Sequence, residues 1–258
     1  MNEETSSYGI NGAALKWIAV ITMIIDHIGA STLHYYMIHH GDYTRTTWLI
    51  YRTCRGIGRI AFPIFIFLLV EGYTHTKSLS RYLMRLGIFC LVSEIPFDLA
   101  FYNRPFYTGN QNIFLTLLIG LAAITGIRKI RDAEGRKPLE YPRQKKQILR
   151  KVFAFFLESI IIAIAFFLAH VLHADYDIPG VAAILVAYRF RNLREGSMIA
   201  ACLTLLFSST SEIFGLFSLI PIYFYNGTRG RQAKYFFYAF YPVHLLILWG
   251  INRLFVGG

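Results

Sequence analysis

The feature that most limits the fold of this chain is a series of long apolar segments separated by short polar loops. Charged residues make up 16% of the 258 residues, against roughly 25% in soluble domains, which excludes a disordered chain and a water-soluble globule. We predict an all-α, polytopic membrane bundle that forms one domain over residues 1–258. About nine segments are candidates for crossing the bilayer. Their approximate bounds are 13–33, 56–74, 82–101, 112–128, 152–173, 178–190, 197–208, 213–225 and 235–255.

The uneven distribution of lysine and arginine predicts the orientation of this bundle. The loop 128–151 carries ten basic and three acidic residues, and we place it in the cytoplasm. Alternation then puts the basic loops 77–85, 189–194 and 229–234 on the same side, so that nineteen of the 26 basic residues lie inside. This predicts a cytoplasmic N-terminus. The net charge of +11 is then explained by topology and contact with anionic lipid, and we expect no nucleic-acid partner.

The first apolar segment contains polar residues that need a reason to lie in a membrane. It follows an acidic N-terminus without the basic flank of a cleaved signal peptide, so we expect a real span. Asp26 and His27 interrupt the run, and Lys16 precedes His27 by eleven residues. Eleven helical steps place Lys16 and His27 on one stripe, roughly 16 Å apart along the axis. This favours a long ligand with anionic groups at one end, although a snorkelling lysine and a buried histidine would also explain it.

The next two segments bring further charges to a similar depth. Arg52, Arg55 and Arg59 share one helix face because their spacings are three and four. Glu94 and Asp98 share a face of the third segment, in its outer half. We expect these acids to be partners of Arg59 and its neighbours, either as a structural salt-bridge network or as part of a reactive site.

Two more polar residues, Asn112 and His244, are predicted at the same level of the bundle. Together with the charges above, they form a polar cluster with the chemistry of a histidine base, carboxylates and arginines. No phosphate-binding loop, nucleophile elbow, zinc motif or dinucleotide fingerprint is present. The histidines in HYYMIHH lack a full ligand set, so we expect no metal.

Several stretches of the chain resemble one known family. These are LKWIAVITMIIDHIGA, GRIAFPIFIFLLVEGYTHT, RYLMRLGIFCLVSEIPFDLAF, QNIFLTLLIG, PIYFYNGTRG and KYFFYAFYPVHLLIL. Together they are similar in order and spacing to the TraX family, named after a conjugative-plasmid protein linked to N-terminal acetylation of the pilin subunit. TraX proteins are in turn similar to the transmembrane acyltransferase-3 group, whose pattern of a basic residue, ten residues and a histidine falls on Lys16 and His27. The resemblance implies acyl-CoA as the donor, His27 as the catalytic candidate, and arginines near the site.

We therefore expect an acetyltransferase of the bacterial cytoplasmic membrane that uses cytoplasmic acetyl-CoA as its donor substrate. The expected catalytic residues are His27, Asp26, Arg59, Glu94 and Asp98. The expected donor-binding residues are Lys16, Arg55, Asn112, Arg229, Arg231 and His244. His27 either deprotonates the acceptor or carries the acetyl group itself. Asp26 points about 100° away from His27 on a regular helix, so Glu94, Asp98 or another helix's carboxylate is the better candidate to orient the ring.

The acceptor is an amine or a hydroxyl, such as a pilin-like N-terminus, a surface glycan or a lipid-linked sugar, reached from the outer side. A transporter or flippase for a small anionic or lipid-linked substrate is the main alternative, because buried charges and helix-breaking prolines also mark transport paths. Against it, no internal repeat is visible. A non-catalytic assembly factor with a buried ion network is a third interpretation.

Overall fold

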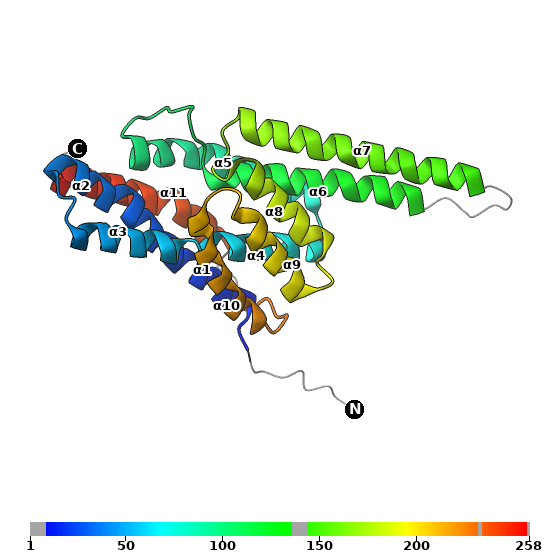
Figure 1. Ribbon diagram of the computed structural model, residues 1–258, viewed down its shortest axis with the longest axis horizontal. Coiled ribbons are helices and arrows are strands. Elements are labelled where there is room, and N and C mark those ends of the chain that lie inside the picture. Colours follow the sequence, from blue (N-terminus) through cyan, green and yellow to red (C-terminus); the bar gives the residue numbers. More distant parts are fainter. Residues whose placement is uncertain (1–8, 136–143, 232–233, 257–258) are drawn as a thin grey trace.

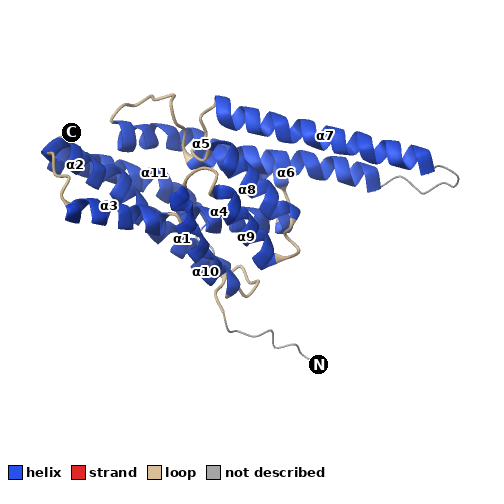
Figure 2. Ribbon diagram, viewed as in Figure 1, coloured by secondary structure: helices blue, strands red, loops and turns tan. Residues whose placement is uncertain are grey.

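The structure, a computed structural model, describes residues 9–135, 144–231 and 234–256, and these residues form helices joined by short loops (Figures 1 and 2). The predicted all-α class is confirmed for this part of the chain. The elements are α1 (Gly12–His27), η1 (Ile28–Leu33), α2 (His34–His40), α3 (Arg45–Gly58), α4 (Ala61–His75), α5 (Leu79–Tyr102), α6 (Ile113–Gly135), α7 (Gln144–Val171), α8 (Asp177–Arg189), α9 (Arg194–Leu205), η2 (Thr210–Ser218), α10 (Leu219–Tyr223), α11 (Lys234–Ile251) and η3 (Asn252–Val256).

Four helical stretches in the described residues are long and apolar enough to cross a membrane. They are Gly12–His40, Arg45–His75, Ile113–Glu134 and Gln147–Val171. The first comprises α1, η1 and α2, and the second comprises α3 and α4. Each of the nine predicted segments coincides with helix, but only these four meet the length and hydropathy that a span requires. The count of nine spans and the cytoplasmic N-terminus stay predictions.

The start of α1 is fixed at one end of the bundle by polar backbone contacts. Asn11 caps the helix, because its Oδ1 accepts from the backbone N–H groups of Ala13 and Ala14 at 3.1 and 2.9 Å. The turn that follows α10 closes over this end, where Gly12 N–H donates to the carbonyl of Thr228 at 2.8 Å.

The break between α3 and α4 positions Arg59, whose side chain is largely buried. Pro63 has no N–H, so it cannot donate to the carbonyl of Arg59 four residues earlier, and the regular helix stops at Gly58 and restarts at Ala61. Gly215 of η2 packs against this freed carbonyl, since a Cβ there would lie 3.3 Å from it. The side chain of Arg59 therefore projects from a bend in the backbone, at the point where α1, α3 and η2 meet.

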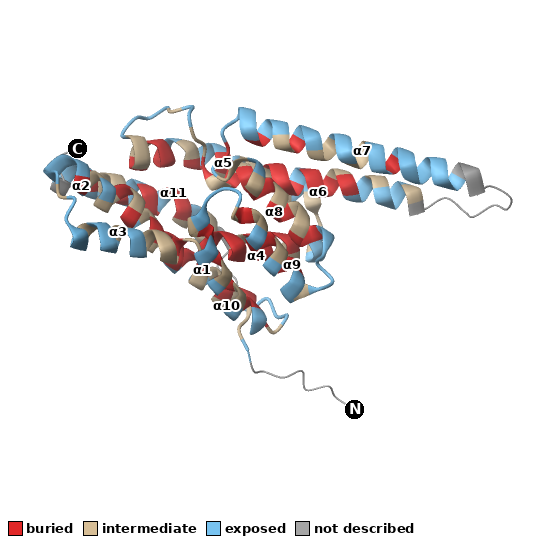
Figure 3. Ribbon diagram, in the orientation of Figure 1, coloured by how far each residue is buried: buried red, intermediate tan, exposed pale blue. Residues whose placement is uncertain are grey.

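A core of buried apolar side chains runs through α1, α4, α5, α6, α8, α9 and α11, whereas α7 exposes most of its surface (Figure 3). Helices α6 and α7 lie side by side and extend beyond the rest of the bundle (Figure 1). Arg131 and Glu158 join them through two hydrogen bonds of 2.8 and 2.7 Å. The predicted loop 128–151 is therefore shorter than expected, because α6 continues to Gly135 and α7 begins at Gln144; residues 136–143 lie outside the described residues.

Candidate functional site

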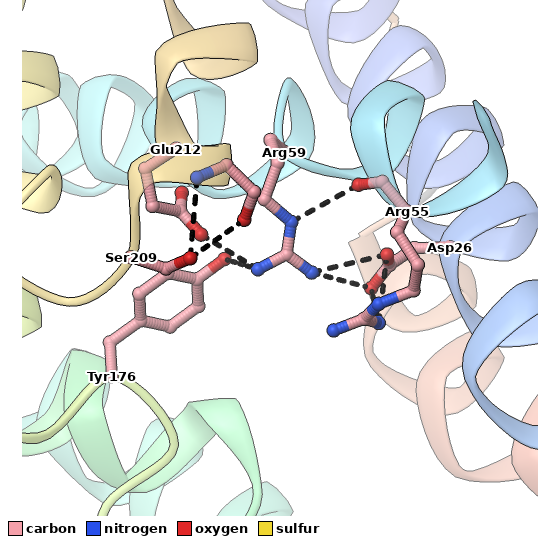
Figure 4. A network of polar contacts seen from close by, with 7 residues as sticks. Asp26, Arg55, Arg59, Tyr176, Ser209 and Glu212 are labelled. Carbon is pink, nitrogen blue, oxygen red and sulfur yellow. Dashed lines mark hydrogen bonds and ion pairs between the residues drawn. The ribbon is translucent and has the colours of Figure 1, made fainter. Parts of the chain in front are cut away.

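Asp26 is the centre of an ion-pair network between α1, α3 and η2 (Figure 4). Arg55 Nη1 donates to both carboxylate oxygens of Asp26 at 2.9 Å, and Arg59 Nη2 donates to them at 3.1 and 3.2 Å. Arg59 Nη1 also donates to Glu212 at 2.7 Å and to the hydroxyl of Tyr176 at 3.3 Å. Two guanidinium groups and two carboxylates thus balance one another inside the bundle, as buried charges require.

A glycine makes room for this network. A Cβ on Gly58 would lie 2.2 Å from the Cβ and Oδ1 atoms of Asp26, so no side chain fits at that position. A Cβ on Gly56, two residues earlier on α3, would lie an ordinary 3.4 Å from Phe214 of η2. Close packing of α3 on α1 therefore depends on Gly58, and the carboxylate of Asp26 fills the space that its missing side chain leaves.

The two arginines of the network differ in how fully they are engaged. Arg59 is 12% exposed and uses its Nε, Nη1 and Nη2 groups, with Nε donating to the carbonyl of Arg55 at 3.2 Å. Arg55 is 32% exposed and uses Nη1 alone among the described contacts. Figure 4 shows its second amino group pointing away from Asp26. Arg55 is thus the arginine that can offer a donor to a ligand.

His27 faces a different helix from its neighbour Asp26, as the helical periodicity predicted. Its Nδ1 lies 2.8 Å from Nε2 of His244 on α11, and the planes of the two rings are nearly parallel, at an angle of 8°. His244 Nδ1 lies 2.9 Å from the carbonyl oxygen of Phe240. Phe101 and Tyr241 present their ring edges to His27. The structure therefore pairs His27 with a second imidazole rather than with a carboxylate.

The imidazole pair and the ion-pair network belong to one polar region. The charges of Arg55 and Arg59 both act on His27, and Arg55 has the larger effect. A regular helical turn ends at His27, and a π-helical turn, η1, follows it. Such widened turns often occur at functional sites because they reorient the side chains around them.

Asp175, in the loop between α7 and α8, is an acidic residue of this region that the sequence did not single out. Loss of hydration in the surrounding protein raises the pKa of Asp175 to about 6, against the opposing charge of Arg59. Its charge also acts on Asp26 and on Tyr241. The residue as a whole is exposed, while its carboxyl group lies close enough to surrounding protein to lose hydration, and in the described part of the chain it forms no hydrogen bond or ion pair. It is a carboxylate that an incoming ligand can reach.

Glu94, Asp98 and Asn112 make their contacts away from the network. Asn112 is fully buried and donates through Nδ2 to Glu94 and to the carbonyl of Cys90, linking α6 to α5. Asp98 accepts from the backbone N–H of Tyr107 at 2.8 Å. The expectation that Glu94 and Asp98 pair with Arg59 is therefore wrong, since Asp26 and Glu212 hold that arginine. Neither acid contacts His27, and His244 takes the orienting position expected for them.

Three of the expected donor-binding residues, Lys16, Arg229 and Arg231, lie at the opposite end of α1. Lys16 lies over the ring of Phe237 on α11, with Nζ 5.6 Å from the centroid. Arg229 and Arg231 are exposed on the turn that covers the start of α1. Beside this turn, Arg194 donates to the carbonyl of Tyr225 at 2.8 Å. Lys16 and the two turn arginines are thus brought to one end of the bundle, whereas Arg55, Asn112 and His244 are not.

A polar pocket of about 350 Å³ opens beside Arg194, between the ends of α4, α8 and α9. Its lining includes Glu71, Thr74, Arg191, Asn192 and Arg194. Glu71 lies on α4, twelve residues after Arg59 at the break that precedes this helix. Among the described residues, no group of three or more histidine, cysteine or acidic side chains could hold a metal ion.

Three residues of the site escaped the sequence analysis: Glu212, Tyr176 and Asp175. Asp175 and Tyr176 lie in a predicted outer loop, where polar residues are ordinary. Glu212 directly precedes the short apolar segment 213–225, where a polar residue is also ordinary. One signal could have found Glu212, because two arginines beside the single Asp26 leave one buried positive charge without a partner.

The comparisons with known proteins establish the family. The model of the family described as TraX protein matches residues 11–252. The chain belongs to the TraX family. It is also similar to the "Probable fimbrial assembly protein FimC, serogroup H1" of Dichelobacter nodosus, with 28% identity over 260 residues that cover 91% of this chain and 92% of the relative. No solved structure matches the chain.

Proposed function

We propose that this TraX protein is an acetyltransferase of the bacterial cytoplasmic membrane, with acetyl-CoA as donor and His27 as the catalytic base. The observation that carries the proposal is the position of His27, which is paired through Nδ1 with His244 and feels the charge of Arg55, an arginine whose second amino group is unengaged. A base and a cation close together are the two elements that acyl transfer needs, because one activates the acceptor and the other stabilises the oxyanion.

The donor reaches this base from the end of the bundle that holds Lys16. Lys16, Arg229 and Arg231 bind its phosphate groups there, with Arg191 and Arg194 of the polar pocket close by. The rise of roughly 16 Å from Lys16 to His27 along α1 suits the length of an extended pantetheine arm. The phosphates then stay at the basic end while the thioester reaches the middle of the bundle.

Transfer proceeds by attack of the acceptor nitrogen or oxygen on the thioester carbonyl carbon. His27 removes the proton from the acceptor as the new bond forms, and the CoA sulfur leaves with the electrons of the carbon–sulfur bond. The proton on His27 then passes to that thiolate. Arg55 stabilises the negative charge that develops on the carbonyl oxygen, whereas Arg59 is occupied by Asp26 and Glu212.

The acceptor approaches from the side of Asp175. An exposed carboxylate close to the network favours an amine that binds as an ammonium group and loses one proton to solvent before it attacks, so we propose a protein N-terminus as the acceptor. The name of the relative from Dichelobacter nodosus refers to fimbrial assembly, and a pilus or fimbrial subunit is therefore the first acceptor to test. A surface glycan with a free hydroxyl group is the second.

The test uses purified protein in lipid nanodiscs with radiolabelled acetyl-CoA. An enzyme binds acetyl-CoA, hydrolyses its thioester slowly without an acceptor, and transfers the label to a peptide with a free N-terminus. A peptide whose N-terminus is blocked serves as the control for an amine acceptor. Flux of a substrate into sealed vesicles together with indifference to acetyl-CoA would instead identify a transporter.

A further inference from the structure

The hydrogen bonds around His244 determine where the protons of the two imidazoles lie. The carbonyl oxygen of Phe240 can only accept, so Nδ1 of His244, 2.9 Å away, must carry a hydrogen. In a neutral His244 the other nitrogen, Nε2, is then an acceptor. Nδ1 of His27 lies 2.8 Å from that acceptor and must therefore donate to it. The remaining nitrogen of His27, Nε2, is left with a free lone pair.

We propose that His244 is a positioning residue that fixes His27 in the tautomer with a bare Nε2 and thereby makes it a base. The proposal rests on the proposed function for the identity of the reaction. The tautomer of His27 follows from the hydrogen bonds alone and does not depend on that function. It replaces the donor-binding role that the sequence indicated for His244. A second imidazole here takes the position that a carboxylate has in a catalytic triad, where it holds the histidine and supports its charged form.

The packing around His244 suits a residue that holds another in place. His244 is 6% exposed, and its ring is stacked against Phe240 on one turn of α11 and meets Tyr241 edge-on. His27 is confined in the same way by the ring edges of Phe101 and Tyr241. These contacts hold the two rings in place, and the carbonyl oxygen of Phe240 sets the direction of the hydrogen bonds between them.

The hydrogen bonds from His27 through His244 to Phe240 also spread the positive charge that His27 gains beside Arg55 and Arg59. When Nε2 of His27 takes the acceptor's proton, its Nδ1–H bond to His244 becomes charge-assisted and stronger. His244 passes part of that charge to the carbonyl of Phe240 through its own Nδ1–H group. No proton has to leave the pair, and the same proton is available for the departing thiolate.

The direct test is the tautomer of His27, read from two-bond ¹H–¹⁵N correlations of protein labelled in its histidine rings and held in nanodiscs. The His27 signals are assigned by their loss in His27→Gln. In the wild type we expect a protonated Nδ1 and a bare Nε2. In His244→Phe, which keeps an aromatic ring but has no acceptor, we expect a protonated Nε2 on His27. A protonated Nε2 in the wild type would overturn the proposal.

Kinetics of two variants separate positioning from simple structural support. His244→Phe should lower kcat by about 10²- to 10⁴-fold, as the wrong tautomer does in a triad, with the KM for acetyl-CoA within about twofold of wild type. His244→Gln should recover part of the rate, because its side-chain oxygen can accept from Nδ1 of His27. His40→Phe, the same change on the exposed end of α2, should leave kcat unchanged. Wild-type kcat in His244→Phe would contradict the proposal.

Failure of the proposed function gives a different pattern. If the wild type shows the expected tautomer but transfers no acetyl group, the positioning role stands and the acetyltransferase assignment falls. If acetyl transfer requires His27 but His27 has a protonated Nε2, the assignment stands and the role of His244 falls.

Discussion

Asp26 and His27 are neighbours in sequence, yet they belong to two polar clusters with opposite properties. Asp26 joins a charged network in which Arg59 is saturated by Asp26, Glu212, Tyr176 and a backbone carbonyl. His27 joins an uncharged pair in which one nitrogen keeps its lone pair. We interpret the charged cluster as the part that holds the helices together and the neutral cluster as the proposed reactive site.

The largest effect on stability should come from breaking the charged network. Arg59→Ala leaves the buried Glu212 without its arginine and leaves Asp26 with Arg55 alone, and such a loss typically costs about 3–5 kcal/mol. Thermal unfolding in detergent should show a large fall in Tm. Arg55→Ala, the control at a more exposed arginine, should lower Tm much less. Equal Tm values for the two variants would contradict the view that Arg59, with all its donor groups engaged, stabilises the fold more than Arg55.

A single methyl group should disturb both clusters at once. Gly58→Ala would place a Cβ 2.2 Å from Asp26 and push α3 away from α1, at a typical cost of about 1–3 kcal/mol. We expect a lower Tm together with a loss of acetyl transfer, because Asp26 cannot move without its neighbour His27. Gly56→Ala meets Phe214 at 3.4 Å and is the matched control. Normal Tm and activity in Gly58→Ala would show that the α1–α3 contact is not required.

The remote end of α1 should affect binding of the donor rather than chemistry. Lys16→Ala removes a phosphate contact far from the reacting atoms, so the KM for acetyl-CoA should rise about tenfold, with a smaller fall in kcat. Steady-state kinetics over a range of acetyl-CoA concentrations give both values. An unchanged KM would exclude Lys16 from the donor site.

The smallest effect should be a pH-dependent gain in stability from Asp175→Asn. Because the pKa of Asp175 is raised to about 6 in the folded protein, its carboxyl group favours folding when protonated and loses that contribution as the pH rises from about 4 through 6. Tm of the variant should therefore exceed that of wild type at pH 7 and match it at pH 4. A difference that is constant across this range would contradict the raised pKa.

The sequence predicted which residues share a helix face better than it predicted which residues pair between helices. Helical periodicity placed Lys16 and His27 on one stripe, separated Asp26 from His27, and put Arg55 and Arg59 on one face, because these relations depend only on the geometry of a single helix. The choice of Asp26 and Glu212 over Glu94 and Asp98 as partners of Arg59 depends on how helices pack. Pattern alone contains no information on that packing.

Asp175 shows the same limit in a loop. Its position beside the network results from the path of the chain between α7 and α8, which no periodicity describes. His244 was correctly predicted at the depth of the site, but its role follows from two distances that only the structure provides.

The central claim is that His27 performs the chemistry while the charged network maintains the fold. It is tested most directly by measuring acetyl transfer and Tm on one preparation of His27→Gln beside wild type. The account predicts that transfer falls by at least about 10²-fold, the lower range for loss of a general base, while Tm stays close to that of wild type. Undiminished transfer in a fully folded His27→Gln protein would contradict the account.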